Sequence, residues 1–360
     1  MQDISKIDKN FVVPEKIDKD DVSFYNIKEN DWCLHGLKYD DTCFFRMDKG
    51  IAESVSPGVA GLNHHTSGGR LRFVTDSEYI AISFKGSLEH HMNHMPLSGS
   101  SSFDIYVDNV FYGSLITTVD AVGGMDTYRE FPDRKPREIL IHFPLYNPVD
   151  EVYLGLQKDA TFLPATPYTY QKPVVFYGSS ITQGGCASRP GCQYSAILAR
   201  QLDFDHINLG FSGNAKAEPA MIDYLANLDM SVLVMDYDHN APSVEHLQNT
   251  HEKLFLAIRE KQPDLPVIMI SKPDFGIPAH TIETDTKRRD IVFNTYKNAI
   301  NRNDKNVYYI NGETFWANEP DPGDCTVDGC HPTDHGFALM AKGIKPTLEK
   351  ALKSQRSVKI

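Results

Sequence analysis

The chain has 360 residues, a length that favours two domains with separate apolar cores. Hydrophobic residues make up 41% of it and charged residues 23%, but no apolar run approaches the length of a membrane-spanning helix, so we expect no membrane span. The formal net charge of −12 argues against a nucleic-acid or anionic-membrane partner, because phosphate binding needs basic patches.

Residues 1–165 have the alternation of apolar and polar positions that is typical of strands buried on one face. Gly, Asn, Asp, Pro and Ser cluster between the alternating runs, and helical periodicity is scarce. Short strands separated by turn residues predict a β-sandwich, jelly-roll-like, over this region. The apolar positions of four strands are Ile80, Ile82 and Phe84; Phe103, Ile105 and Val107; Ile139, Ile141 and Phe143; and Val152, Leu154 and Leu156.

The pattern changes near residue 165. Residues 163–173, LPATPYTYQKP, are rich in proline and threonine without periodicity, so we expect a linker there. Residues 172–360 alternate short apolar runs with amphipathic stretches, which predicts an α/β domain with a doubly wound parallel sheet. Its ligands should bind at the carboxyl ends of the strands. The expected strands are 174–177, 206–209, 232–235, 267–270 and 307–310, and the expected helices are 194–202, 243–261 and 290–300.

The segment VVFYGSSITQGG, residues 174–185, places Ser179 and Ser180 at the carboxyl end of the first of these strands. Thr182 stands where the nucleophile elbow of α/β-hydrolases has its second glycine, and the Gly-Lys-[Ser/Thr] ending of a phosphate loop is missing. A serine in such a turn is often only a helix cap. A catalytic serine also needs a histidine to accept its proton and a carboxylate to orient that histidine.

Three Asp-x-x-His segments offer that pair: Asp203/His206, Asp236/His239 and Asp328/His331. The first leads into a strand and is predicted to be structural. The second is a rival, because it lies at the carboxyl end of the third strand. We favour Asp328 and His331, whose spacing puts both side chains on one side of a single turn just before a helix that Pro332 opens.

Two further loops at the same edge of the sheet offer donors for an oxyanion. NLGFSGNA, residues 208–215, follows the second strand and contains Gly213, whose backbone N–H is open to close approach. MDYDHNAP, residues 235–242, follows the third strand and contains Asn240, whose side-chain amide can donate. Ser, Gly, Asn and Asp-His in this order on successive strand ends favour acyl-transfer chemistry.

This arrangement resembles the SGNH (GDSL-type) hydrolase family over about residues 172–352. In that family a serine follows the first strand, a glycine and an asparagine complete the oxyanion hole, and a C-terminal Asp-x-x-His supplies the acid and the base. The resemblance implies that Ser180 is the nucleophile and that Asp328 and His331 complete the triad. It also implies that the Ser180 N–H, Gly213 and Asn240 form the oxyanion hole.

A β-sandwich ahead of such a domain resembles the carbohydrate esterases of this superfamily. The resemblance implies a serine esterase that removes acetyl or other short acyl groups from carbohydrate, and we expect neither a cofactor nor a metal. Ser179 and Ala241 replace two acidic residues of the family motifs. They keep open an alternative, a glycan-binding protein with an inactive hydrolase domain. A lipase or thioesterase of the same family is a further alternative, and the oligomeric state is not indicated.

The six cysteines fall into three close pairs, Cys33/Cys43, Cys186/Cys192 and Cys325/Cys330. This spacing is compatible with local disulfides, and we predict a Cys325–Cys330 bridge that restricts the loop carrying Asp328. The first 20 residues contain no apolar signal core, so the sequence fits either a cytoplasmic protein or an exported mature form. The cysteine pairs favour a periplasmic or extracellular location.

One histidine-rich segment, EHHMNHM, contains His90, His91 and His94. Histidines without a carboxylate or cysteine at a settled spacing are weak evidence for a metal. We therefore predict a solvated loop.

Overall fold

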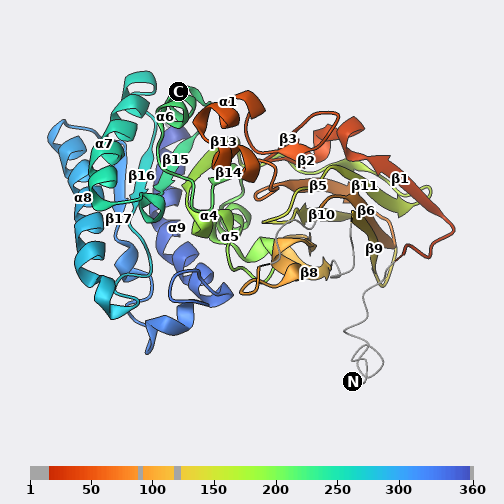
Figure 1. Cartoon of the computed structure of the whole chain (residues 1–360). Helices are drawn as coiled ribbons and strands as arrows, with labels where there is room; N and C mark the ends of the chain where they lie inside the picture. The colour runs from red at the N-terminus through yellow and green to blue at the C-terminus, as the bar shows by residue number, and fades with distance from the viewer. Residues whose placement is uncertain (1–15, 88–91, 117–122, 357–360) are drawn as a thin grey trace.

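The computed structural model describes residues 16–87, 92–116 and 123–356. Figure 1 shows a region of antiparallel strands beside a second region in which helices surround a parallel sheet. This is the predicted fold class, an N-terminal β-sandwich followed by a parallel α/β unit. None of the helices within the described ranges is both long and apolar enough to cross a bilayer.

The N-terminal region contains two large antiparallel sheets that enclose one apolar core, and a short pair of strands, β3 (Lys38–Tyr39) and β4 (Phe44–Phe45). The first sheet has the order β1 (Val22–Asn26), β11 (Glu151–Gln157), β6 (Tyr79–Lys85), β9 (Gly124–Glu130). The second has the order β12 (Leu163–Pro164), β5 (Arg70–Thr75), β10 (Arg137–His142), β7 (Phe103–Val107), β8 (Val110–Leu115), and β2 (Leu34–His35) also pairs with β5. Alternate side chains of both sheets, such as Ile82 and Ile141, form the core between them, as their period-2 pattern predicted.

The second region is built on a parallel sheet with the order β14 (Phe204–Gly210), β13 (Tyr170–Gly178), β15 (Val232–Asp236), β16 (Val267–Ile270), β17 (Val307–Ile310). All five predicted strands are present. Consecutive side chains of β13 enter different cores: Val175 and Tyr177 pack on one face of the sheet, and Val174 and Phe176 on the other. Burial on both faces is the reason why these strands are continuously apolar.

Helices cover both faces of the parallel sheet. The helices α6 (Pro219–Asn227), α7 (Val244–Lys261) and α8 (Ile282–Asn301) cover one face, and α5 (Tyr194–Leu202) and α9 (Asp334–Arg356) cover the other. Helix α8 begins eight residues before the predicted segment 290–300. The sequence pattern missed its first turns because they are polar and carry no apolar period.

The predicted linker at residues 163–173 is shorter in the structure, because strands occupy both of its ends and leave residues 165–169 between them. Leu163 and Pro164 form β12 at the edge of the second sandwich sheet, and β13 already begins at Tyr170. The prolines in this segment led to the expectation of a linker, but an edge strand and a β-bulge both tolerate proline. Pro173 lies at the break in register between Tyr170 and Val174.

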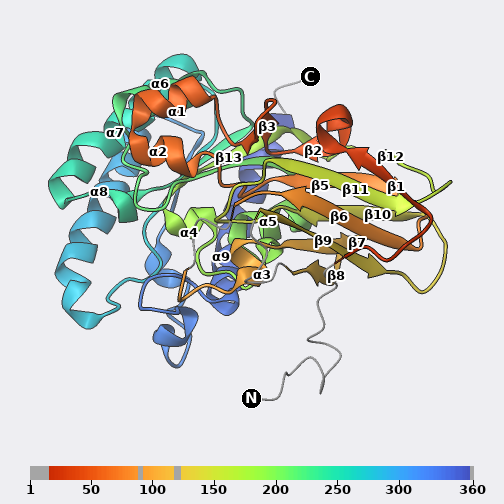
Figure 2. The same cartoon turned by 45° about the vertical axis from the view of Figure 1, so that its right-hand side comes forward.

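Two short helices of the N-terminal region, α1 (Lys49–Val55) and α2 (Pro57–Leu62), pack against the parallel α/β region (Figure 2). Helical periodicity did not reveal them, since each has two turns or fewer. Their caps are clear in the structure: Asp48 accepts a hydrogen bond from the N–H of Ile51, and Ser56 accepts one from Val59. The side chains of Ala52 and Val59 belong to the same apolar core as β13 and α6.

Arg46, just before α1, fastens the two regions together. Its buried guanidinium donates to the carbonyl oxygens of Gly210, Asn208 (3.3 Å) and Leu62 (2.6 Å), and it lies over the ring of Phe211. The N-terminal region is therefore hydrogen-bonded directly to the carboxyl end of β14.

The packing of α2 predicts that Val59→Asp destabilises the whole protein. Val59 is 0% exposed in the core of the α/β region, and a buried unpaired carboxylate should lower the free energy of unfolding by about 3 kcal/mol or more. Urea unfolding followed by circular dichroism measures the change. The control is Val110→Asp, because Val110 is 70% exposed on β8 and should shift the midpoint little. Equal midpoints for both variants would show that α2 does not support the core.

Candidate active site

The carboxyl end of β13 presents Ser180 at the start of a short helix. Strand β13 ends at Gly178, and α4 (Ser180–Gln183) begins two residues later. The hydroxyl of Ser179 is the N-cap and accepts a hydrogen bond from the N–H of Ile181 at 3.2 Å. Ser180 is the first helical residue, so its own N–H has no acceptor within the helix. The two serines therefore have different environments, because Ser179 is buried and Ser180 is half-buried.

Gly178 has a steric role at this turn. A Cβ there would lie 2.1 Å from Oγ1 of Thr182 and 2.3 Å from the carbonyl oxygen of Asp236. The N–H of Ser179 donates to that same carbonyl oxygen at 3.2 Å. The turn that carries Ser180 is therefore packed directly against the end of β15.

The structure brings Ser180 together with His331 and Asp328. Nε2 of His331 lies 2.9 Å from Oγ of Ser180, and Nδ1 of His331 lies 2.8 Å from Oδ2 of Asp328. The loop before α9 holds this pair, since Thr326 and Pro332 form an antiparallel bridge and the N–H of Val327 donates to the carbonyl of His331. Serine, imidazole and carboxylate thus form one continuous chain of hydrogen bonds.

Local hydrogen bonds keep Asp328 ionised. Its Oδ1 accepts the backbone N–H groups of Cys330 at 3.0 Å and His331 at 2.8 Å. Partial burial opposes ionisation, but these bonds and the His331 ring outweigh it and hold the pKa of Asp328 below its usual value. The carboxylate can therefore orient His331 and stabilise its protonated form.

The two predicted oxyanion donors lie on loops that meet beside Gly178. Phe211 joins these loops, because its N–H donates to the carbonyl of Gly178 at 2.9 Å and its carbonyl accepts from Nδ2 of Asn240 at 2.7 Å. One N–H of the Asn240 amide is used in this contact, and the other donates to none of the residues in the described ranges. Gly213 has φ of +69°, so a glycine is needed for its backbone conformation. Its N–H donates to none of the residues that the structure describes.

Asp236 and His239, the rival pair, do not contact each other through a hydrogen bond among the described residues. Oδ2 of Asp236 accepts the hydroxyls of Thr182 at 3.0 Å and Tyr194 at 2.9 Å. Burial, together with the charge of Asp238, raises the pKa of Asp236 to about 7, although both hydroxyls favour the carboxylate. The side chain of Asp236 therefore supports the turn that carries Ser180 and does not orient His239.

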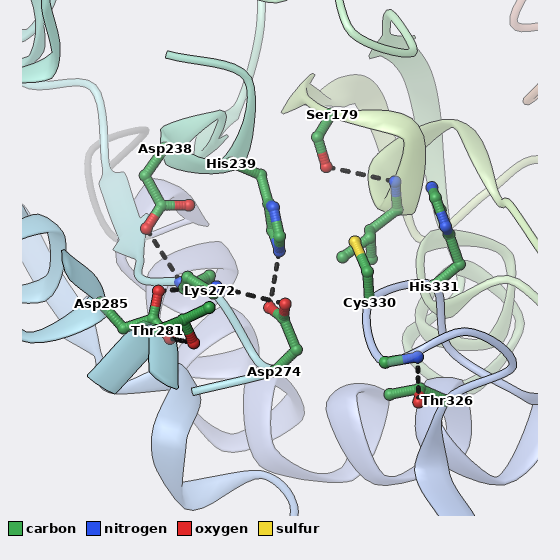
Figure 3. Close-up of polar contacts among 12 residues, drawn as sticks. Ser179, Asp238, His239, Lys272, Asp274, Thr281, Asp285, Thr326, Cys330 and His331 are labelled. Carbon is green, nitrogen blue, oxygen red and sulfur yellow. Dashed lines mark hydrogen bonds and ion pairs between the residues drawn. The ribbon is translucent and has the colours of Figure 1, made fainter. Parts of the chain in front are cut away.

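His239 is paired with a carboxylate that sequence reasoning missed. Its Nε2 lies 2.6 Å from Oδ1 of Asp274, and Figure 3 shows the ring pointing toward that side chain. Nζ of Lys272 lies 3.2 Å from Asp274 and 2.8 Å from Asp285. Burial opposes protonation of His239, but Asp274 outweighs it and raises the pKa of the imidazole. The place of Asp274 after the fourth strand of the sheet was the available signal.

Two residues from the N-terminal region reach this site, and neither was predicted. The hydroxyl of Tyr146 donates to the carbonyl of Ser180 at 3.0 Å. The ring of His94 lies 5.5 Å from the ring of His331 in an edge-on arrangement. His94 is exposed, as expected, but it contacts His331 instead of lying free in solvent. His90 and His91 lie outside the described residues.

A cavity of about 420 Å³ opens beside Gly213. Ser212 and Asn214, on either side of Gly213, form one wall, and α2 forms the opposite wall with Gly58 and Gly61. The remaining lining residues are Pro57, Leu62, His65, Met92 and Tyr146. Both regions of the chain therefore contribute to the space next to the candidate oxyanion donor.

The predicted Cys325–Cys330 disulfide is wrong in this structure, where all six cysteines are free. Cys325 lies in the apolar core beside α9, where Glu319 and His335 are its polar neighbours. Cys330 instead lies close to His239 and Asp274 (Figure 3). Backbone hydrogen bonds hold this loop instead, including the bridge between Thr326 and Pro332.

Comparisons with known proteins define the class of this protein. Residues 171–349 match the GDSL-like lipase/acylhydrolase family, and residues 22–162 match the N-terminus of esterases of the SGNH-hydrolase type. The chain therefore belongs to the SGNH (GDSL-type) hydrolases and is an esterase or acylhydrolase of that family. No curated protein matches the sequence significantly.

Solved structures resemble the whole chain, including the sandwich. A candidate GDSL-like lipase from Bacteroides ovatus shares 27% identity and a TM-score of 0.81, and the match covers 92% of this chain and 98% of that one. The salicylyl-acyltransferase of a tetracycline biosynthetic pathway has 19% identity, a TM-score of 0.73 and coverage of 94% and 96%. A family two carbohydrate esterase from Clostridium thermocellum has 13% identity, a TM-score of 0.61 and coverage of 92% and 99%. The last two show a shared fold.

The raised pKa of Asp236 predicts a specific pH dependence of stability. The folded-state pKa is about 7 and the unfolded value is near 3.8, so the contribution of Asp236 to stability is fully present below about pH 4 and is lost as the pH rises to about 7. Asp236→Asn should therefore gain stability relative to the parent protein across this window, by up to about 1.4 kcal/mol for each pH unit. Urea unfolding of both proteins from pH 4 to 8 measures the difference. Parallel curves would contradict the prediction.

Proposed function

We propose that this protein is a serine esterase that removes acetyl or other short acyl groups from carbohydrate. The observation that carries the proposal is the chain of contacts from Oγ of Ser180 to Nε2 of His331, at 2.9 Å, and from Nδ1 of His331 to Asp328, at 2.8 Å. This is the arrangement that nucleophilic catalysis by a serine requires.

The proposed reaction begins with attack of Oγ of Ser180 on the ester carbonyl carbon, while Nε2 of His331 accepts the hydroxyl proton. Asp328 stabilises the imidazolium that forms. The imidazolium then gives its proton to the departing alcohol oxygen, which leaves an acyl group on Ser180. Water, deprotonated by His331, attacks that acyl group and releases the acid and the free serine.

The oxyanion of each tetrahedral intermediate needs donors that are already in place. Ser180 and Gly213 supply backbone N–H groups, and Asn240 supplies the amide N–H that Phe211 leaves over. One such donor is worth about 2.7–4 kcal/mol in an acyl-transfer site. The ties of Phe211 to Gly178 and Asn240 keep these donors at fixed positions before substrate binds.

The cavity beside Gly213 supports a sugar as the alcohol part of the substrate. Its volume of about 420 Å³ is far more than an acetyl group needs and is in the range of small-molecule sites. Leu62, Met92 and Tyr146 offer apolar surface for the face of a sugar ring, and Ser212 and Asn214 offer polar groups for its hydroxyls. The shared fold with a carbohydrate esterase is consistent with this assignment.

The departure of Ser179 from the family motif does not favour an inactive domain. Its hydroxyl caps α4 through the N–H of Ile181, a role that serine and aspartate both perform well. The side chain that faces His331 is that of Ser180, and it is present. We therefore prefer the enzyme to the alternative of a glycan-binding protein.

The triad predicts that Ser180→Ala and His331→Ala each lower the turnover of p-nitrophenyl acetate by about 10⁶-fold, because nucleophile and base act as a unit. The double variant should lose little more than either single variant. Initial rates with purified protein measure these losses.

Ser179→Ala and His239→Ala are the matched controls, because each lies beside a triad candidate without completing the chain of contacts. Both should retain most of the activity. An inactive Ser179 variant with an active Ser180 variant would reverse the assignment of the nucleophile, and the reverse ranking of the histidines would place the base at His239.

The cavity predicts that Gly61→Leu selectively lowers activity on acetylated sugars. A Cβ at Gly61 meets nothing within 4 Å, so a larger side chain extends into the cavity without displacing its neighbours. We expect kcat/KM for an acetylated monosaccharide to fall about tenfold or more, since a change of 1.4 kcal/mol is tenfold. Hydrolysis of ethyl acetate, whose alcohol is small, should change little.

Gly50→Leu is the control for this substitution, because Gly50 is also exposed but lies in α1 and does not line the cavity. It should leave both substrates unaffected. Unchanged hydrolysis of the acetylated sugar by Gly61→Leu would remove the cavity from the substrate-binding site.

A further inference from the structure

Three side chains of the kinds that bind metals meet at His331 in the candidate active site. One ring nitrogen of His94, one ring nitrogen of His331 and Sγ of Cys186 all lie within 4.8 Å of one another. They come from three distant parts of the chain. A tetrahedral zinc ion binds nitrogen at about 2.0–2.1 Å and sulfur at about 2.3 Å, so modest side-chain movements would bring all three atoms onto one ion.

The hydrogen bonds of His331 decide which of its atoms is available. Asp328 holds Nδ1 at 2.8 Å, which leaves Nε2, the nitrogen that contacts Oγ of Ser180 at 2.9 Å, as the atom that could bind a metal. In zinc sites the ligating imidazole often gives its other ring N–H to a carboxylate, which orients the ring and raises its basicity. The interaction that makes His331 a candidate base therefore also makes it a good zinc ligand.

Two neighbouring clusters are less suitable for a metal. A cluster of Asp328, Cys330 and His331 would compete for the Asp328 carboxylate, which already accepts three hydrogen bonds from Cys330 and His331. A cluster of His239, Asp274 and Cys330 lies beside the ammonium group of Lys272, 3.2 Å from Asp274, which opposes a second cation (Figure 3). The His94 cluster has neither conflict.

We propose that His94, Cys186 and His331 form a binding site for Zn²⁺ or another thiophilic divalent cation, and that occupation of this site switches the enzyme off. The Cys186 thiol gives its proton to solvent as the sulfur binds the metal, and a water molecule or Oγ of Ser180 supplies the fourth ligand. With its Nε2 lone pair on the metal, His331 cannot accept the proton of Ser180.

The inhibitory consequence rests on the proposed function, because it assumes that His331 is the base, whereas metal binding does not. Binding is therefore measured separately from activity. Titration calorimetry with ZnCl₂ should give one tight site in the parent protein and also in Ser180→Ala. Co²⁺ in place of Zn²⁺ should give a thiolate-to-cobalt charge-transfer band, which identifies a sulfur ligand.

Three variants test the ligand set. His94→Ala, at an exposed position, and Cys186→Ser should each weaken zinc binding at least about tenfold, and Cys186→Ser should abolish the cobalt band. Cys330→Ser is the matched control, since Cys330 is the other cysteine near His331, and it should leave both unchanged. Circular dichroism confirms folding, and His94→Ala decides the outcome if Cys186→Ser does not fold.

Hydrolysis of p-nitrophenyl acetate, relative to the metal-free rate of each protein, gives the inhibition. Zinc should inhibit the parent protein and Cys330→Ser alike, EDTA should reverse this, and Mg²⁺, which prefers oxygen ligands, should have no effect. Loss of the cobalt band in Cys330→Ser, or equal zinc affinity in all variants, would overturn the site. Tight binding through His94 and Cys186 without inhibition would keep the site and refute the role of His331 as base.

Discussion

The close packing of the β13 turn against the end of β15 is the constraint on which the rest of the site depends. Gly178 leaves no room for a side chain between Thr182 and the carbonyl of Asp236, and that carbonyl accepts the N–H of Ser179. These contacts set where the strand stops and where α4 begins. The turn lies beside the loops that follow β14 and β15, because the carboxyl ends of parallel strands meet at one edge of the sheet. Phe211 connects the three segments through its hydrogen bonds to Gly178 and Asn240. These contacts therefore fix the position of the turn that carries Ser180.

The surroundings of two Asp-His pairs explain why similar motifs occupy different places. Asp328 is exposed and ionised, and it sits in a turn whose backbone N–H groups support its charge, so it can orient a histidine that reaches Ser180. Asp236 is buried, and its pKa lies near 7 because desolvation opposes the carboxylate. The hydroxyls of Thr182 and Tyr194 occupy it, which leaves His239 to pair with Asp274. The same Asp-x-x-His spacing therefore gives a hydrogen-bonded Asp-His pair near solvent in one loop and a buried aspartate that binds two hydroxyls in the other.

The N-terminal region is part of the site and of the α/β core. Arg46 donates to carbonyls at the carboxyl end of β14, Tyr146 donates to the carbonyl of Ser180, and α2 forms a wall of the cavity beside Gly213. An accessory sandwich joined only by a linker would have none of these contacts. The α/β region thus provides the turn with the nucleophile candidate, and the N-terminal region provides a wall of the adjacent cavity. Residues in that wall can change without altering the triad candidates.

The sequence by itself determined the strands of both regions and the order of the candidate residues along them. Period-2 and continuous apolar patterns are local, and the strand ends of a parallel sheet necessarily meet at one edge, so Ser180, Gly213 and Asn240 could be placed in advance. Only the tertiary structure decided which Asp-His pair reaches Ser180, because that contact joins residues 151 positions apart. It also decided the pairing of His239 with Asp274, the contact of His94 with His331 and the free state of Cys325 and Cys330. Each of these depends on side-chain distances between segments whose separation no local pattern encodes.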